Sequence, residues 1–570
     1  MQFDYVIVGG GSAGSVLANR LSAKSSHTVC LLEAGPDTPP ERMPKEILEA
    51  SVLPNYFEPY RYWTKLEAYM DALGNRSVEE LMATTKPRRY EQARVMGGGS
   101  TVNGQVAVRG IPLDYDEWEA MGARGWAFKD VLPYFRRLER DMDFDGPFHG
   151  KDGPIPIHRT FPPDWGGLTL AMREACGKKG IQSFPDCHAE FGDGCFPHPR
   201  SNAYGHRVSA ALGYLDGATR MRTNLHIRDQ TFVEALLFEG RRAVGVRVRR
   251  HGTTEEIRAR TVIVSCGAIH SPAFLMRAGI GPAEELRSLG IGVRADRPGV
   301  GQNLQDHPLL GLGLHLTPAG RMSPDVGHTY VMSVRWSSRQ DGCAPQDMKL
   351  SVSNRFSHTR MGERLGAILF GPNKSYSKGF VRLRSTDPED EPLVAFNLFS
   401  DPRDLVRMAQ AARFAHELLA MPECRSLWTD VWPGIYSDTV RSLMPKSRWN
   451  DLKSDIASVL LDWGGPARQM VLKRAMDPRF SMEGVLKNEA TMNAWIREGS
   501  QGDWHACGTC RMGQADDRSA VVDAKGRVIG LEGLHVADAS VMPSVPCANT
   551  NITTIMIGEK MSDHVLECAT

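Results

Sequence analysis

The sequence of 570 residues lacks the features that would place the protein in a membrane or on a nucleic acid. No window reaches the roughly 18 uninterrupted apolar residues of a membrane-spanning helix. The 68 Lys and Arg residues almost balance the 67 Asp and Glu residues, so neither sign of charge is in excess. A balanced chain has no bulk field to attract nucleic acid or an anionic membrane. We therefore expect neither a membrane span nor a nucleic-acid partner.

An export signal and a disulfide framework are also missing. Asp4 interrupts the first residues, and no basic region precedes an apolar stretch there. The 11 cysteines are odd in number and are scattered from Cys30 to Cys568. In a chain without an export signal, such cysteines are typical of reduced thiols. These observations predict a cytoplasmic protein.

The sequence does contain enough apolar residues for a core, together with many loop residues. Apolar residues make up 41% of the chain, including 11 Trp, 13 Tyr and 20 Phe, which excludes disorder as the ground state. The 56 Gly and 35 Pro exceed the usual share, which favours long ordered loops over a helical bundle. No internal repeat or low-complexity linker is visible. We expect a mixed α/β protein.

The first 33 residues have the pattern of a βαβ unit. Residues 5–8 form a short apolar run of the kind found in a strand buried on both faces. A glycine-rich turn follows at residues 9–14, and then residues 15–21 show helical spacing of apolar side chains. A second buried strand is predicted at residues 28–32 and ends at Glu33. Strand, glycine turn, helix, strand and acid therefore follow one another in order.

The glycines of this turn fit the dinucleotide-binding fingerprint. Gly9 permits the tight turn, Gly11 lets a pyrophosphate approach the backbone, and Gly14 lets helix and strand pack closely. Phosphate oxygens would then lie at a helix N-terminus, where free N–H groups favour negative charge. Glu33 can accept hydrogen bonds from ribose hydroxyls, and an acid there disfavours the 2′-phosphate of NADP. The pattern alone does not separate NAD from FAD.

Further strand-like and helical runs are spread over the remaining chain. The pattern returns near the C-terminus, which predicts one nucleotide-binding domain assembled from separate pieces with another domain inserted. Strands are expected at residues 225–233, 243–248, 261–265 and 534–537, helices at 271–277, 401–419 and from about 553, and alternating runs at 349–354 and 379–384. The predicted nucleotide-binding domain comprises residues 1–155, 205–315 and 500–570, and the inserted domain residues 156–204 and 316–499.

Six blocks in order along the chain carry a family resemblance. They are the N-terminal unit closing with LEAG at 32–35, RVMGGGSTVN at 94–103, GAIHSP at 267–272, VGQNLQDH at 300–307, HACGTCRMG at 505–513, and VADAS at 536–540 with NTN at 549–551. In these blocks the chain resembles the glucose–methanol–choline (GMC) flavoprotein oxidoreductases. The resemblance implies a Rossmann-like FAD-binding domain built from discontinuous segments, with an inserted α+β substrate domain that carries an antiparallel sheet.

The resemblance also implies roles for individual residues. His505 and Asn549 would be catalytic and would face the flavin. The position at which some family members attach FAD through a histidine corresponds to Val102, so we expect non-covalent FAD. Phe370, Asn373 and Trp504 are expected in the substrate pocket. The expected FAD-binding residues are Gly9, Gly11, Ser12, Ala13, Gly14, Glu33, Arg94, Met96, Gly98, Gly99, Ser100, Asn103, Val106, Val233, Asp538, Ala539, Asn549, Asn551 and Thr554.

Four shorter blocks look most like the bacterial hydroxymethylfurfural and aryl-alcohol oxidases, namely residues 90–94, 114–118, 131–135 and 207–211. This likeness implies oxidation of a primary aryl or furfuryl alcohol to the aldehyde, with O2 reoxidising the flavin to give H2O2. A dehydrogenase that passes electrons to a quinone or protein acceptor is the alternative. A flavin-containing lyase on the same scaffold is a third hypothesis. The segment at residues 428–487 is longer than the family pattern.

The residue types suit alcohol oxidation. A hydride leaves carbon readily only when the oxygen carries alkoxide-like charge, and a neutral imidazole such as that of His505 can accept the hydroxyl proton. The amide of Asn549 can hold the same oxygen by a hydrogen bond. Cys507 and Cys510 have the spacing of a zinc half-site, but no second ligand pair is visible, so we expect packing residues and no metal site.

Overall fold

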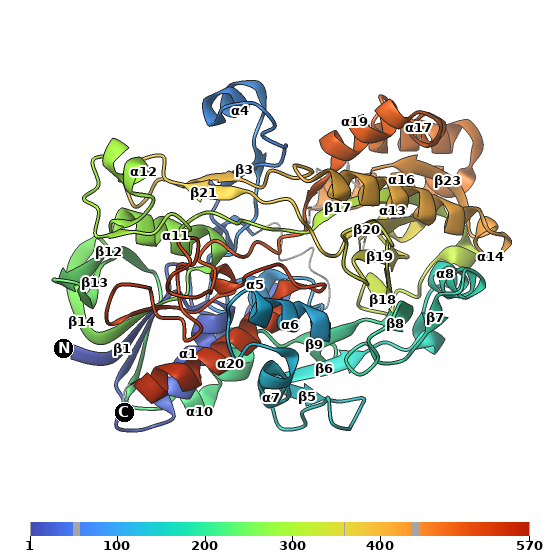
Figure 1. The fold of residues 1–570 in the computed structure, drawn as a ribbon. Helices are drawn as coiled ribbons and strands as arrows, with labels where there is room; N and C mark the ends of the chain where they lie inside the picture. Colours follow the sequence, from blue (N-terminus) through green and yellow to red (C-terminus); the bar gives the residue numbers. More distant parts are fainter. Residues whose placement is uncertain (1, 50–57, 358, 435–444, 446, 569–570) are drawn as a thin grey trace.

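In the computed structural model, which describes all residues except 1, 50–57, 358, 435–444, 446 and 569–570, the N-terminal unit lies inside a seven-stranded sheet (Figure 1). Strand β1 (Gln2–Val8) is parallel to β2 (Val29–Leu32) on one side and to β14 (Thr253–Val264) on the other. Beyond them, β2 pairs in parallel with β11 (Leu225–Arg228), and β14 with β25 (Leu534–Val536). One sheet therefore joins segments from the start, the middle and the end of the chain.

The same sheet continues as an antiparallel meander from β14 through β13 (Arg242–Arg250) to β12 (Thr231–Glu239). The sequence predicted one strand over residues 225–233, and this prediction was wrong. Gln230 has a φ of 47°, in the left-handed region that breaks a strand. The backbone N–H of Gln230 turns to the carbonyl of Gly35 at 2.9 Å, so β12 begins beside the end of β2.

Two helices bring distant residues to the carboxyl edge of this sheet. Helix α1 (Ser12–Ser22) begins directly after the glycine turn and packs against α20 (Thr550–Cys568) (Figure 1). The Ser12 hydroxyl donates a hydrogen bond to the Asn551 amide oxygen at 3.0 Å, across 539 residues of sequence. The first turns of the two helices are therefore held together.

The buried carboxylate of Glu559 fixes this helix pair. It accepts hydrogen bonds from Arg20 on α1 at 2.6 and 2.9 Å, from Arg137 at 2.6 Å and from the Tyr214 hydroxyl at 2.6 Å. A buried charge with several donors is stable in place, whereas the same charge without them would be costly. Helix α20 therefore has one position along α1.

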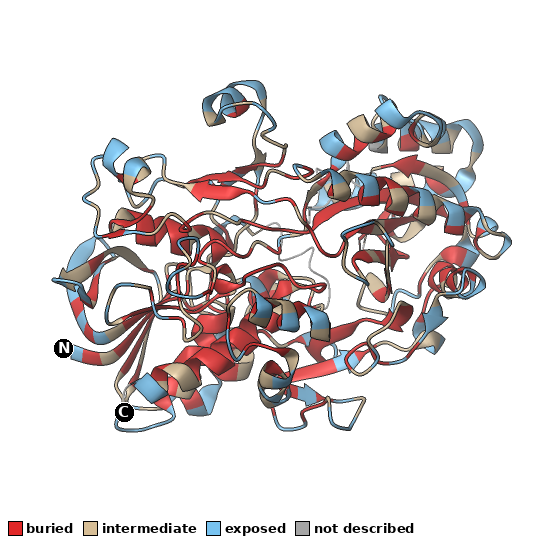
Figure 2. Ribbon diagram, in the orientation of Figure 1, coloured by how far each residue is buried: buried red, intermediate tan, exposed pale blue. Residues whose placement is uncertain are grey.

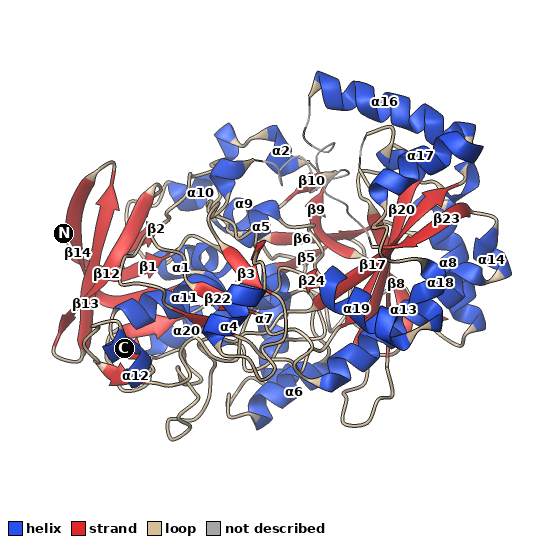
Figure 3. Ribbon diagram, turned by 90° about the horizontal axis from the view of Figure 1, so that it is seen from above, coloured by secondary structure: helices blue, strands red, loops and turns tan. Residues whose placement is uncertain are grey.

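A second large sheet has eight strands and follows the antiparallel pattern expected for the inserted domain, apart from the parallel pair β7–β8. Helix α13 (Pro402–Ala420) packs against its β17, β19 and β20, and Figure 3 shows further helices gathered around it. Figure 2 shows buried strands in the second sheet and at β1 and β2, whereas much of the β12–β14 meander is intermediate or exposed. The strands of this sheet are β23 (Trp428–Pro433), β17 (Pro308–Leu316), β20 (Leu365–Pro372), β19 (Met348–Ser353), β18 (Tyr330–Trp336), β8 (Gly194–Pro197), β7 (Gln182–Ser183) and β24 (Gln501–Gly502).

The remaining strands and α-helices of the described residues lie outside the two large sheets. The small strands are β10 (His206–Arg207), β9 (Pro199–Ala203), β6 (Ile155–Arg159) and β5 (Glu139–Asp141), then β21 (Phe380–Arg382), β22 (Leu393–Ala395), β3 (Glu67–Tyr69) and β4 (Arg88–Arg89), and β15 (Ile280–Gly281) with β16 (Ala295–Asp296). The helices are α2 (Lys45–Leu48), α4 (Val78–Thr84), α5 (Gly99–Val102), α6 (Pro112–Ala120), α7 (Phe128–Leu138), α8 (Gly167–Lys178), α9 (Ala210–Tyr214), α10 (Gly217–Arg220), α11 (Gly267–Arg277), α12 (Ala283–Ser288), α14 (Pro422–Arg425), α16 (Arg448–Trp463), α17 (Gly465–Ala475), α18 (Met482–Lys487) and α19 (Glu489–Gly499).

The expected extra segment at residues 428–487 forms β23 and helices α16 to α18, except for 435–444 and 446, which lie outside the described residues. Strand β23 extends the second sheet at its β17 edge. The expected boundary at residue 315 falls at the end of β17, and the division into two domains stays a prediction. Within the described part of the chain, no helix is long and apolar enough to cross a bilayer.

Candidate active site

A cavity of about 560 Å³ runs between the first sheet and the second. One end lies at the glycine turn and the first turn of α1, and the other at strands β18 to β20. Residues far apart in sequence line it, because both sheets and the start of α20 contribute. The expected FAD-binding residues that line this cavity are Gly9, Gly11, Ser12, Ala13, Glu33, Gly98, Gly99, Asn103, Val106, Val233, Asp538, Ala539, Asn549, Asn551 and Thr554.

Each glycine of the first turn has the geometric role that its position predicts. Gly9 has a φ of 101°, and a Cβ there would lie 2.5 Å from the carbonyl oxygen of Ser265. A Cβ on Gly14 would lie 2.0 Å from the carbonyl oxygen of Gly9, so helix and strand touch there. A Cβ on Gly11 would have one close neighbour among the described residues, the Ser265 carbonyl oxygen at 3.8 Å, so there is open space at the start of α1. That space is where a phosphate would approach free N–H groups.

The second glycine cluster packs directly onto the first. The Gly97 N–H donates to the Gly10 carbonyl at 2.7 Å. Gly98 has a φ of 53°, and a Cβ there would lie 2.9 Å from the Gly11 Cα. Only glycine combines this φ with so close an approach. The two loops therefore form one wall of the cavity.

Glu33 is placed at the end of β2, as expected. Its carboxylate accepts hydrogen bonds from the backbone N–H groups of Gly10 at 2.9 Å and Gly35 at 2.8 Å. Burial raises the pKa of Glu33, and these N–H donors partly offset that effect. The side chain thus braces the glycine turn while it lines the cavity.

Four expected FAD-binding residues support the cavity from behind and are not among its lining residues. Gly14 packs on Gly9, as described above. The Met96 sulfur lies where a Cβ on Gly10 would be, and the Ser100 hydroxyl bonds the Gly97 carbonyl at 2.6 Å and receives the Ala210 N–H at 2.9 Å. The Arg94 guanidinium lies 4.8 Å above the Trp63 ring. Their conformations fix the two glycine loops.

His505 and Asn549 meet at the wall of the cavity. The Asn549 amide nitrogen and the His505 Nε2 are 3.0 Å apart. On its other side, the His505 Nδ1 lies 2.9 Å from the Nδ1 of His307. Asp306 holds this arrangement, because its carboxylate accepts the backbone N–H groups of His505 at 2.9 Å and His307 at 2.7 Å.

The neighbours of His307 determine the tautomer of His505. The His307 Nε2 lies 3.1 Å from the Asn373 carbonyl and 3.0 Å from the Pro546 carbonyl, so it carries the proton and donates. The Nδ1 of a neutral His307 is then an acceptor, and the His505 Nδ1 must donate to it. The His505 Nε2 is left with a lone pair, which accepts from the Asn549 amide and borders the cavity.

Burial keeps both imidazoles neutral. It lowers the pKa of His505 well below the usual value of 6.5, and the nearby Lys349 cation lowers it further. Burial likewise lowers the pKa of His307 well below the usual value. Burial raises the pKa of Asp306 to about 7. The lone pair on His505 Nε2 is therefore available at neutral pH.

The far end of the cavity is formed by one face of the second sheet. Leu369, Ser351 and Ser333 lie side by side on β20, β19 and β18 and line it. Because side chains alternate along a strand, Phe370 lies on the opposite face and contacts Trp495 beneath the sheet. The expected place of Phe370 in the substrate pocket was therefore wrong.

Asn373 also lies behind the site and not in it. Its amide donates to the Cys547 carbonyl at 2.7 Å, while its own carbonyl accepts from His307. It thus holds the loop that carries Asn549. Trp504 does line the cavity, and its indole N–H donates to Glu91 at 3.0 Å. Cys507 and Cys510 are buried, free and unpaired with each other, as packing residues are.

Sequence reasoning missed the polar side of the substrate end. His198 bonds the Ser333 hydroxyl, and Ser333 lies 3.2 Å from Ser351. Lys349 also lines the cavity and bonds Asp503 at 2.6 Å. Lys349 and Ser351 alternate with apolar residues along β19. That alternation is visible in the sequence, but it does not say which face meets the cofactor.

Two models of the GMC oxidoreductase family match the chain, one over residues 3–309 and the other over residues 375–558. The chain is a GMC oxidoreductase. This GMC oxidoreductase is an FAD-dependent enzyme that acts on CH–OH donors, since that is the chemistry of its family.

Relatives of this GMC oxidoreductase align over nearly its whole length. It is 41% identical to the 5-(hydroxymethyl)furfural oxidase of Methylovorus sp. (strain MP688), over 99% of this chain and 98% of that protein. It is 33% identical to the oxygen-dependent choline dehydrogenase of Sinorhizobium fredii (strain NBRC 101917 / NGR234), over 99% and 96%. The structure of pyridoxine 4-oxidase from Mesorbium loti is similar with a TM-score of 0.79 and 26% identity, over 98% of both chains.

The residues of this GMC oxidoreductase fit FAD. The open space at Gly11 and the first turn of α1 suit a pyrophosphate, and Glu33 lies at the end of β2 where a ribose is held. Asp538 closes the cavity where it accepts the Gly267 N–H at 2.8 Å and the Ser271 hydroxyl at 2.6 Å. His505 also lines this cavity, so one continuous space joins the glycine cradle to His505.

We predict that Gly11→Ala folds but binds FAD at least about tenfold more weakly, because the added methyl group occupies the space for the phosphate without a steric clash with the protein. The measurement is FAD affinity of the apoenzyme, with bound FAD counted in the supernatant after acid precipitation. Gly14→Ala is the matched control: its methyl group meets the Gly9 carbonyl, so it should lower the unfolding temperature as well. Wild-type FAD affinity in Gly11→Ala would contradict the assignment.

Proposed function

We propose that this enzyme oxidises a primary alcohol on an aryl or furan ring to the aldehyde, with His505 as the base and O2 as the final electron acceptor. The observation that carries the proposal is the lone pair of His505 Nε2, which faces the cavity beside the Asn549 amide. The His505 side chain is buried in the cavity wall, and the contacts of His307 favour the tautomer that a base requires.

In this proposal the alcohol breaks the hydrogen bond that the Asn549 amide donates to His505 Nε2, and its hydroxyl group binds between the two side chains. The Asn549 amide donates to the alcohol oxygen, and His505 Nε2 takes the hydroxyl proton as charge develops on that oxygen. The new imidazolium keeps its Nδ1–H bond to His307, and the Asp503 carboxylate, 3.5 Å from Nδ1, stabilises its charge. FAD, when bound, supplies the acceptor for the hydride that leaves the carbon.

The substrate class follows from the end of the cavity beyond His505. Leu309, Leu369 and Tyr330 give it apolar walls suited to a flat ring. Lys349 and Asp503 form an ion pair at 2.6 Å in this wall, and such a pair has no net negative charge to attract a quaternary ammonium group such as that of choline. A neutral aryl or furfuryl alcohol suits these walls, and the 41% identical relative, named as a 5-(hydroxymethyl)furfural oxidase, supports the same class.

We also propose that FAD is bound without a covalent link. Val102, at the position where some family members carry a histidine, lines the cavity and offers no nucleophilic atom. The names of the two relatives support O2 as acceptor, since one is an oxidase and the other is oxygen-dependent.

We predict that 5-(hydroxymethyl)furfural and benzyl alcohol bleach the oxidised flavin band anaerobically in the dark, whereas choline does so far more slowly. In air, one H2O2 should form for each aldehyde. Stopped-flow absorbance measures flavin reduction by the alcohol, and a coupled peroxide assay measures H2O2 formation in air. Flavin reduction without peroxide would indicate a quinone or protein acceptor, and aldehyde release without bleaching would overturn the oxidation itself.

His505→Ala should keep its yellow colour and lose at least about 100-fold in the rate constant for anaerobic flavin reduction, because the base is gone. His315→Gln is the control, since His315 is buried in β17 and bonds Thr429 at 2.7 Å away from the cavity lining. It should reduce its flavin at the wild-type rate. Equal rates in both variants would exclude His505 as the base.

The lowered pKa of His505 predicts how the reductive rate depends on pH. A base must be neutral to accept a proton, so the rate constant should stay level as the pH falls through 6.5 and decline only at more acidic pH. Burial raises the pKa of the neighbouring Asp306 to about 7, which would add an inflection, so the profile is repeated in Asp306→Asn. A decline centred near 6.5 in both proteins would contradict the prediction.

A further inference from the structure

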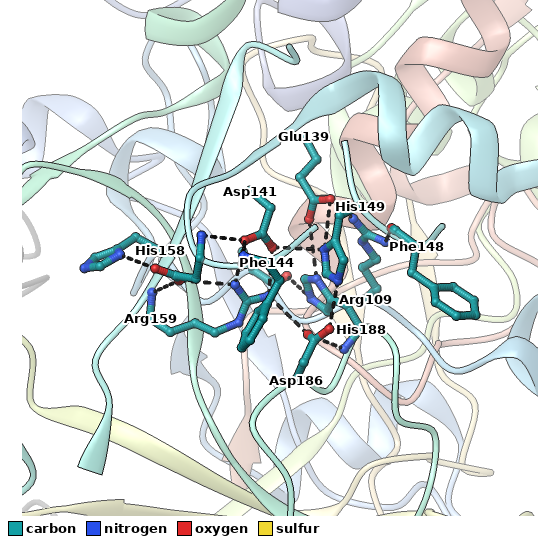
Figure 4. Close-up of polar contacts among 12 residues, drawn as sticks. Arg109, Glu139, Asp141, Phe144, Phe148, His149, His158, Arg159, Asp186 and His188 are labelled. Atoms are coloured by element: carbon teal, nitrogen blue, oxygen red, sulfur yellow. Dashed lines mark hydrogen bonds and ion pairs between the residues drawn. The ribbon is translucent and has the colours of Figure 1, made fainter. Parts of the chain in front are cut away.

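A second cluster of ionisable side chains lies outside the cavity, around strand β5 (Figure 4). Glu139 and Asp141 come from β5, and His149 and His188 from two separate loops. All four are buried, and one oxygen or nitrogen atom from each lies within 4.8 Å of the others. None of them takes part in the chemistry proposed above.

The tautomer of His149 is fixed from outside the cluster. Its Nε2 lies 2.8 Å from a carboxylate oxygen of Asp186. Asp186 is ionised, because it also accepts the His188 N–H at 3.0 Å and the Arg159 guanidinium at 3.3 Å. The His149 Nε2 therefore donates, and its Nδ1 faces Asp141 Oδ2 at 3.1 Å. Burial lowers the pKa of His149, but hydrogen bonding to Asp141, Asp186 and Glu139 outweighs burial and raises it to about 10, so a metal ion would bind Nδ1 by displacing its proton.

His188 is oriented in the same way by the backbone. Its Nε2 donates to the Ala107 carbonyl at 3.1 Å, so the Nδ1 of a neutral ring is an acceptor. This buried Nδ1 has no hydrogen-bond partner, and neither has the Glu139 Oε1 that faces it at 3.5 Å. Two acceptors thus face each other across a gap that is too long for a hydrogen bond.

The spacing of these atoms matches the ligands of one metal ion. Zinc bound tetrahedrally at about 2.0 Å holds its ligands about 3.3 Å apart. The His149 Nδ1 lies 3.1 Å from Asp141 Oδ2, the His188 Nδ1 lies 3.5 Å from Glu139 Oε1, and the four ligand atoms all lie within 4.8 Å of one another. Imidazole and carboxylate ligands suit zinc and its neighbours among the divalent metals. Asp186, which accepts the His149 Nε2–H, would act as the outer carboxylate that commonly orients a metal-binding histidine.

The charges around the cluster also favour a divalent cation. Arg159 pairs with Asp141 at 2.9 and 3.0 Å and with Asp143 at 3.2 Å, and Arg109 pairs with Glu139 at 2.5 Å. The four carboxylates of Glu139, Asp141, Asp143 and Asp186 exceed the two guanidinium groups and the protonated His149 by one negative charge. A divalent cation that displaces the His149 proton makes the cluster neutral.

We propose that Glu139 Oε1, Asp141 Oδ2, His149 Nδ1 and His188 Nδ1 bind one zinc-class divalent cation. Four buried protein ligands leave no open position for substrate, so the role is structural. The ion would join β5, the loop that carries His149 and the loop that carries His188. Through the Ala107 carbonyl it would also support the segment beside Val106, which lines the FAD cavity.

The first experiment measures the metal content of the FAD-loaded enzyme. The protein is produced in zinc-supplemented medium without a metal-affinity tag, and zinc is counted by mass spectrometry relative to bound FAD. We expect about one zinc per chain, and zinc K-edge absorption should show only nitrogen and oxygen ligands near 2.0 Å. Less than about 0.1 zinc per chain, with no uptake when zinc is titrated into chelator-treated holoenzyme, would overturn the proposal.

Variants then locate the ion. Glu139→Gln places an amide N–H where it can donate to the His188 Nδ1, so it fills the gap without metal. It should keep its FAD and lose at least about tenfold of its zinc. His158→Gln is the matched control, because His158 precedes Arg159 on β6 but is half exposed and pairs only with Asp143. It should keep its zinc.

A third variant excludes the active site as the place of binding. Asp306, His307 and His505 also bring three possible ligand atoms together. His505→Ala should therefore keep a full complement of zinc. Loss of zinc in His505→Ala but not in Glu139→Gln would overturn the assignment to the cluster at β5. If Glu139→Gln fails to fold, the wild-type zinc content and the ligand distances from absorption still decide the proposal.

Discussion

Two backbone carbonyl groups, those of Asn373 and Pro546, determine which nitrogen of His505 carries the lone pair and which carries the proton. They hold the proton of His307 on Nε2, so His307 must accept from His505, and the lone pair of His505 is left on the cavity side. The chemistry therefore depends on three loops from different parts of the chain being in register. Asp306 supports that register through the backbone N–H groups of both histidines.

The discontinuous first sheet makes this arrangement possible. The glycine turn belongs to the start of the chain, while Asn549 and α20 belong to its end, and Glu559 holds α20 against α1 through Arg20. The second sheet contributes one face only, along Leu369, Ser351 and Ser333. The glycine cradle and Asn549 thus belong to the frame of the first sheet, whereas His307 and His505 lie next to β17 and β24 of the second sheet. On β18 to β20, the side chains that line the cavity alternate with core side chains on the opposite face.

The sequence predicts best where one residue type has a local mechanical role. The glycines at 9, 11 and 14 and the acid at 33 could be placed because a tight turn, a phosphate approach and a helix–strand contact each require them. Phe370 was assigned to the wrong face of β20. The sequence predicts that side chains alternate along a strand, but which set faces the cavity depends on the packing of α13 against the sheet. The four side chains around β5 follow no motif, since their spacing in sequence reflects loops that only the fold brings together. The break at Gln230 could not be predicted, because a left-handed φ at one residue does not change the pattern of apolar residues along the chain.

The hydrogen bond between Ser12 and Asn551 joins residues that the ribosome makes far apart in time. A ribosome that adds ~5–20 residues per second needs on the order of a minute to reach the last helix. Until then the glycine turn of the nascent chain has no opposite wall, and β14 has no β25 beside it. The full flavin cradle can therefore form only after α20 has been synthesised, whereas the pairing of β1 with β2 needs only the first 32 residues.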